Sequence, residues 1–177
     1  MYPEPRIETI GEKKLIGMHL SMSHGHNRTA ELWSSFMPQC NAIPSKLNSD
    51  LYSLQIYPST YSFQRFDPMA SFEKWAAVEV STHSNIPEGM EALTIPGGQY
   101  AVFTYKGNPI HATPFFQYIF GTWLPSSEYE LDARPHFEVL GAKYKNNDDA
   151  SEEEVWVPDA EAGVLATNCV FTTELGR

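Results

Sequence analysis

The stretch RPHFEVLGAKY, residues 134–144, has the pattern on which the fold prediction turns. Read as a strand, it places Phe137 and Val139 on one face and Glu138 and Leu140 on the other. A carboxylate therefore interrupts an otherwise apolar strand. An ionised group in such a place is costly for folding unless it is paired or hydrogen-bonded. Glu138 is for this reason the first candidate for a site residue.

The stretch FEKWAAVEVS, residues 72–81, has the same character. Read as a strand, it puts Glu79 on the same face as Trp75 and Ala77. This strand could equally lie at an edge of a sheet, with the Glu79 carboxylate in solvent. Glu79 is therefore a second, weaker candidate, and Trp75 is a candidate because it shares its face.

Working outward from these two strands, the same order of elements occurs in both halves of the chain. The first half predicts a strand, a helix that Asn27 or Thr29 can cap and Pro38 ends, and two more strands. The second half predicts a strand with a kink or bulge at Gly97-Gly98, a helix from Thr113-Pro114 to Pro125, and two strands. The six strands are expected at residues 14–21, 51–58 and 74–81, and at 91–107, 136–144 and 153–158.

This self-similarity predicts an α+β fold of two βαββ repeats with pseudo-two-fold symmetry. We expect a single domain over residues 1–158, with repeats at about 5–81 and 90–158. Both helices should pack on one side of the strands and leave a central ligand cleft at the join. The alternative is an ordinary α+β domain in which the order recurs by chance. Residues 159–177 are left open as an added strand, a disordered tail or a foreign remnant.

Composition excludes several classes of protein. Hydrophobic residues make up 42% of the 177 residues and charged residues only 19%, which argues against disorder. The net charge of −10 opposes direct binding to nucleic acid and favours cationic ligands. No secretory signal or membrane-spanning run is visible, and Cys40 and Cys169 are interpreted as two free thiols, so we expect a cytoplasmic protein. His24 and His26 have no third ligand nearby, so neither a metal nor a cofactor is expected.

Four stretches taken together resemble the GyrI-like family, a small-molecule-binding domain also found as the effector domain of some AraC-type and MerR-type regulators. These stretches are GGQYAVFTYKG (97–107), FGTWLP (120–125), EYELDARPHFEVLG (128–141) and EEEVWVP (152–158). The resemblance covers roughly residues 5–158 and implies a cleft lined by aromatic residues around a buried glutamate, a position that Glu138 fits. It also implies that ligands are often cationic, aromatic or hydrophobic. No helix-turn-helix precedes the domain and the tail lacks the usual family ending, so we expect a stand-alone member.

The candidate site residues have competing structural roles. Glu138 could instead form a salt bridge to a basic residue such as Arg134. The other ligand-binding candidates are aromatic residues that are by default core, with Trp123 and Tyr105 ahead of Trp75, Trp33 and Phe36.

Three functions are consistent with the sequence. The first is a sensor or sequestering module that binds small cationic or hydrophobic aromatic compounds. The second, implied by hydrolases with a similar sequence, is hydrolysis of a strained electrophile, with Glu138 and perhaps Glu79 activating water. The third is an interaction protein that modulates a topoisomerase, with DNA gyrase or a regulator as its partner. A homodimer is left open.

Overall fold

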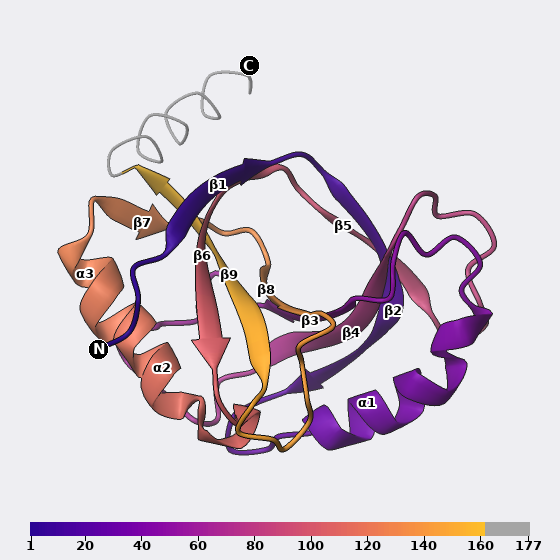
Figure 1. Ribbon diagram of the computed structural model, residues 1–177, viewed down its shortest axis with the longest axis horizontal. Coiled ribbons are helices and arrows are strands. Elements are labelled where there is room, and N and C mark those ends of the chain that lie inside the picture. The colour runs from indigo at the N-terminus through magenta and orange to yellow at the C-terminus, as the bar shows by residue number, and fades with distance from the viewer. Residues whose placement is uncertain (162–177) are drawn as a thin grey trace.

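The computed structural model describes residues 1–161, which form a mixed α+β structure (Figure 1). The strands are β1 Arg6–Ile10, β2 Lys13–Met22, β3 Leu51–Ile56, β4 Phe72–Val80, β5 Glu91–Ile95, β6 Gly98–Lys106, β7 Tyr129–Leu131, β8 His136–Leu140 and β9 Glu152–Glu161. The helical segments are α1 Thr29–Phe36, the 3-10 helices η1 Met37–Ala42 and η2 Pro109–His111, α2 Thr113–Tyr118, the π-helix η3 Ile119–Trp123 and α3 Leu124–Ser126. No helix within this part of the chain is long and apolar enough to cross a membrane.

The strands form one antiparallel sheet in the order β1-β6-β9-β8-β3-β4-β2-β5, with β7 paired to β9. Strands β3 and β8 pair at the middle, where Ser53 lies opposite Glu138. On one side of this pair follow β4 and β2, and on the other side β9 and β6. The order β2-α1-β3-β4 in the first half thus repeats as β6-α2-β8-β9 in the second. This arrangement confirms the predicted fold class.

The two main helices pack on the same face of the sheet and leave its middle uncovered. Helix α1 buries Leu32 and Phe36 against Ile16 of β2 and the apolar residues of β4. Helix α2 and the π-helix η3 bury Phe115 and Ile119 against β6 and β9. In Figure 1 both helices lie outside the curve of the sheet, α2 at the left and α1 at the right.

The concave face of the sheet holds a third apolar cluster. Strand alternation sends its side chains inward while their neighbours face the helices. Phe137 and Trp156, for example, stack with ring centroids 5.3 Å apart across β8 and β9. The cluster consists of Leu15, Tyr52, Leu54, Trp75, Ala77, Ile95, Tyr100, Val102, Phe137 and Trp156.

The expectation of one kinked strand over 91–107 was wrong. The stretch forms β5 and β6, which lie toward opposite ends of the sheet order. Pro96 and Gly97 carry the chain across the end of the molecule, where the β1–β2 link also crosses (top of Figure 1). A Cβ at Gly97 would lie 2.9 Å from the carbonyl oxygen of Ile10, so only glycine fits this crossing without a shift.

Three smaller features also differ from the prediction or extend it. The helical segment that was predicted to end at Pro38 continues past it as the 3-10 helix η1, in which Cys40 is buried. Helix α3 includes Pro125 and ends at Ser126. Strand β9 runs through Asp159 to Glu161, while the rest of the predicted tail and Cys169 lie outside the described residues.

Candidate functional site

A cavity of about 650 Å³ opens on the helix-bearing face of the sheet, between the two helices. Its floor comes from β3, β4, β8 and β9, and its walls come from the segment before α1, from α2 and η3, and from the loop between β3 and β4. Aromatic rings dominate its lining: Tyr57, Tyr61, Phe63, Phe66, Phe72, Phe116, Phe120 and His136.

Glu138 lies on the cavity floor because its neighbours on β8, Phe137 and Val139, point to the concave core. It is buried, with 9% of its surface exposed. Its main partner is Gln55 of β3, whose Nε2 donates hydrogen bonds to the two carboxylate oxygens at 3.1 and 3.4 Å. Among residues 1–161 no basic side chain forms an ion pair with Glu138.

Arg134, the alternative partner considered for Glu138, is engaged elsewhere. Its Nε pairs with Asp132 at 2.7 Å, and one guanidinium nitrogen donates to the backbone carbonyl of Gln99 at 2.6 Å. Its guanidinium also lies over the ring of Tyr100, 4.5 Å from the centroid. The Glu138 carboxylate is therefore held by a neutral amide, and its charge is left for another group.

Two more ionisable groups lie near Glu138. Lys74 of β4 lines the cavity. Glu153 of β9 is buried on the same face as Val155, which pairs with Glu138. Burial and the nearby Glu138 charge raise the pKa of Glu153 to about 7, although Lys74 opposes the rise. Lys74 and Glu138 thus line the cavity, while Glu153 lies near both charges but outside the lining.

His136 belongs to the aromatic wall and not to the charged groups. Its ring lies 5.0 Å from Tyr57, 5.8 Å from Phe120 and 5.3 Å from Phe63, on which it stacks. Burial lowers the pKa of His136 to about 3, so the ring is neutral near pH 7. Phe63 also stacks on Phe120 at 4.6 Å, which joins the β3–β4 loop to the second helix.

With this geometry described, comparison with known proteins assigns the family. The model of the GyrI-like small-molecule-binding domain matches residues 3–158. The chain belongs to the GyrI-like family. No curated protein matches the sequence.

Solved structures of low sequence identity share the GyrI-like fold. SAV2435 bound to tetraphenylphosphonium has a TM-score of 0.64 at 14% identity, over 89% of this chain and 94% of that chain. The C-terminal domain of EcmrR has a TM-score of 0.67 at 12% identity, over 91% and 99%. A hydrolase from Listeria innocua has a TM-score of 0.55 at 9% identity, over 89% and 92%.

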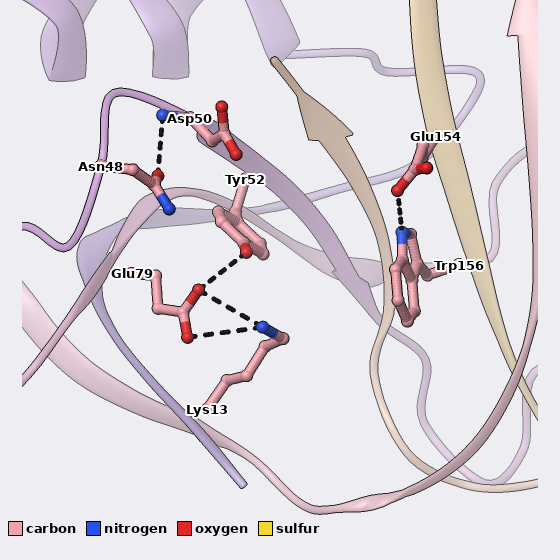
Figure 2. Close-up of polar contacts among 7 residues, drawn as sticks. All are labelled: Lys13, Asn48, Asp50, Tyr52, Glu79, Glu154 and Trp156. Carbon is pink, nitrogen blue, oxygen red and sulfur yellow. Dashed lines mark hydrogen bonds and ion pairs between the residues drawn. The ribbon is translucent and has the colours of Figure 1, made fainter. Parts of the chain in front are cut away.

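In this GyrI-like domain Glu79 and Trp75 face the concave side, opposite the cavity. Tyr52 donates a hydrogen bond to Glu79 at 2.9 Å, and Lys13 pairs with Glu79 at 3.3 Å (Figure 2). Trp75 stacks on His19 with 4.4 Å between ring centroids. The positions of Glu79 and Trp75 follow from strand alternation in β4, where odd-numbered residues point to the concave core.

The other aromatic candidates lie in or beside the helix cores, outside the cavity lining. Phe36 is buried under α1, and Trp33 packs partly buried against it. Tyr105 donates to the carbonyl of Asn108 at 2.9 Å within the core beneath α2. Trp123 donates to Glu4 at 3.1 Å and lines a separate concavity of about 530 Å³ near the start of the chain.

Sequence reasoning missed most of the residues that surround Glu138. Gln55 had a readable signal, because it is a polar residue in the apolar strand LYSLQI, as Glu138 is in its own strand. The stretch YPSTYSF, residues 57–63, also had a signal, because it places three aromatic residues in a loop. His136 could be noticed beside Glu138, as a possible proton relay or a packing residue. Lys74 could not, since its role depends on which face of the sheet bears the helices.

Proposed function

We propose that this GyrI-like domain is a sensor or sequestering module that binds cationic, hydrophobic aromatic compounds between its two helices. The observation that carries the proposal is the environment of the Glu138 carboxylate. Its carboxylate is buried on the floor of a cavity, accepts hydrogen bonds from Gln55 and has no ion pair among the described residues. Such a carboxylate lacks a counter-ion that a ligand would supply.

The aromatic lining suits the same ligand class. Ring faces attract cations, and their area binds the apolar body of a ligand. A charge–charge attraction is also stronger in a water-poor cavity than in solvent. The structure of SAV2435 bound to tetraphenylphosphonium supports the proposal, because a related fold holds an aromatic cation.

A matched pair of ligands tests the role of charge. 10-Methylacridinium and 9-methylanthracene have the same shape, but only the first carries a positive charge. We expect the cation to bind about tenfold tighter or better, since an interaction with a charged group is worth on the order of 2 kcal/mol. Quenching of tryptophan fluorescence or ligand fluorescence measures both affinities. Equal affinities would show that the charge of Glu138 does not contribute to binding.

Hydrolysis is a second candidate, favoured by Glu153. With its pKa raised to about 7 beside Glu138, Glu153 would help the pair to accept and return a proton near neutral pH. A carboxylate would take a proton from water, the hydroxide would open an epoxide carbon–oxygen bond, and the alkoxide would recover the proton to give a diol. Incubation with styrene oxide tests this: diol formation that the Glu138→Gln variant lacks supports catalysis, and unchanged epoxide leaves binding alone.

A further inference from the structure

The cavity is unusual for a site that would accept a cation, because Lys74 lines it together with Glu138. Lys74 is partly buried, and no ion pair with it is formed within residues 1–161. A ligand with only a positive charge would therefore gain from Glu138 and be repelled by Lys74.

The strand register keeps the two charges apart on the same floor. Lys74 of β4 lies opposite Gln55 of β3, and Gln55 lies opposite His136 of β8. Glu138 is two residues further along β8, on the same face. Two strand spacings are about 10 Å, so the backbone positions of Lys74 and Glu138 are far enough apart for a ligand to reach both groups. Gln55, which donates to Glu138, fills the position between them.

The end of the cavity near Lys74 is also polar. His24, Ser23, Asn27 and Thr29, all from the segment that leads into α1, line it. Burial and the nearby Lys74 charge lower the pKa of His24, and the same charge opposes the rise in the pKa of Glu153 on β9. Donors and a positive charge suit an anionic group, whereas the Glu138 end suits a cationic one.

We infer that the ligand of this cavity is bipolar: an aromatic body with a cationic group that pairs with Glu138 and an anionic group that pairs with Lys74. This inference rests on the proposed function and narrows it from aromatic cations in general to compounds with both charges at separated positions. The aromatic wall of Phe63, Phe120 and His136 would hold the body between the two groups.

Three rod-shaped compounds separate the contributions. 4′-(Aminomethyl)biphenyl-4-carboxylate carries both charges at opposite ends, 4-(aminomethyl)biphenyl carries only the cation, and biphenyl-4-carboxylate carries only the anion. Calorimetric or fluorescence titration at pH 7.5 gives the three affinities. The bipolar compound should bind about tenfold tighter than the cation, because the ion pair with Lys74 adds a charged hydrogen bond.

Variants then locate each charge. Lys74→Gln should remove the preference for the bipolar compound and leave the cation bound as tightly as before or more tightly. Lys106→Gln is the matched control, since it removes one positive charge at an exposed lysine outside the cavity lining. It should leave the preference intact. Circular dichroism of each variant confirms that it is folded.

The outcomes distinguish this inference from the proposed function. If the cation binds and depends on Glu138, but the bipolar compound shows no preference or keeps it in Lys74→Gln, the bipolar ligand is wrong and cation binding stands. If Glu138→Gln leaves the affinity for the cation unchanged, the proposed function itself fails.

Discussion

Glu153 shows how strongly burial next to Glu138 acts on the pKa of a single residue. Because its pKa in the folded protein is about 7, well above the ordinary value of about 4.3 for glutamate, the folded state holds this proton more tightly than the unfolded chain does. The resulting stability is present below about pH 4 and is lost as the pH rises to about 7.

Glu153→Gln should therefore stabilise the fold only at higher pH. Above pH 7 we expect a gain of up to about 3 kcal/mol in the free energy of unfolding, and near pH 4 almost none, since protonated glutamate resembles glutamine. Urea unfolding at pH 4 and pH 8 measures the two differences. An equal gain at both values would show that the charge of Glu153 is not responsible.

His19, on the concave face of the sheet, is a basic group whose pKa is raised by acidic partners. Its ring lies between Glu73, at 2.8 Å, and Glu91. Partial burial alone would lower the pKa of His19, but the hydrogen bonds to both glutamates and their charges outweigh burial and raise it above 6.5. Its stabilising effect is full below pH 6.5 and is lost as the pH rises through the folded-state pKa.

The melting temperature of His19→Gln should accordingly fall further below that of the wild type at pH 6 than at pH 9. Thermal melts at both values, followed by circular dichroism, give the comparison. A deficit that grows with pH would contradict the assignment of His19 as a protonated link between β4 and β5.

Glu138 and Glu79 also show how far site residues could be predicted from the sequence. Glu138 and Glu79 look alike in the sequence, because each interrupts an apolar strand. Alternation tells which residues share a face within one strand, but it does not tell which face bears the helices and the cavity. That choice depends on how two strands from different repeats, β3 and β8, pair. The same pairing brings Gln55 to Glu138 and could not be read from either stretch.

At the scale of the element, two consecutive residues of helix α2 have different roles, one in the core and one in the cavity lining. Phe115 is 1% exposed in the core beneath the helix, whereas Phe116 lines the cavity. Phe115→Ala should cost about 3–5 kcal/mol of stability, as for other buried phenylalanines.

Phe116→Ala should cost much less stability and weaken binding of 10-methylacridinium several-fold, in line with the ~1 kcal/mol of an aromatic contact. Urea unfolding and titration of both variants provide the test. Loss of affinity without loss of stability in Phe115→Ala would mean that the two faces of the helix are assigned the wrong way round.

The elements were predictable where one local pattern decided them. The two main helices and the five strands β2, β3, β4, β8 and β9 follow from periodicity and proline positions. The predicted caps were wrong, because the residues before the two helices are Arg28 and Ala112 and neither makes a side-chain cap hydrogen bond. The division of residues 91–107 into β5 and β6 was not predictable, because β5 pairs with β2 at one end of the sheet while β6 pairs with β9 and β1 toward the other. Only the curvature of the whole sheet brings these ends close enough for Pro96 and Gly97 to connect them.

On the scale of the whole molecule, the pseudo-two-fold arrangement explains where the cavity lies. Each repeat covers its own strands with one helix, so the helix-bearing face is left open at the β3–β8 join. The symmetry is broken by the loop between β3 and β4, which supplies Tyr57, Tyr61, Phe63 and Phe66 from the first repeat only. The repeat thus provides the cleft, and the loop provides much of its aromatic lining.

The central claim is that Glu138 serves binding while Glu79, on the opposite face, serves the fold. The most direct test measures the affinity for 10-methylacridinium and the free energy of unfolding on the same samples of Glu138→Gln and Glu79→Gln. Glu138→Gln should lose about tenfold or more in affinity and keep or gain stability, since a desolvated charge is removed. Glu79→Gln should keep its affinity and lose about 1–3 kcal/mol of stability, since its bonds to Tyr52 and Lys13 are weakened. Lost stability with unchanged affinity in Glu138→Gln would contradict the account.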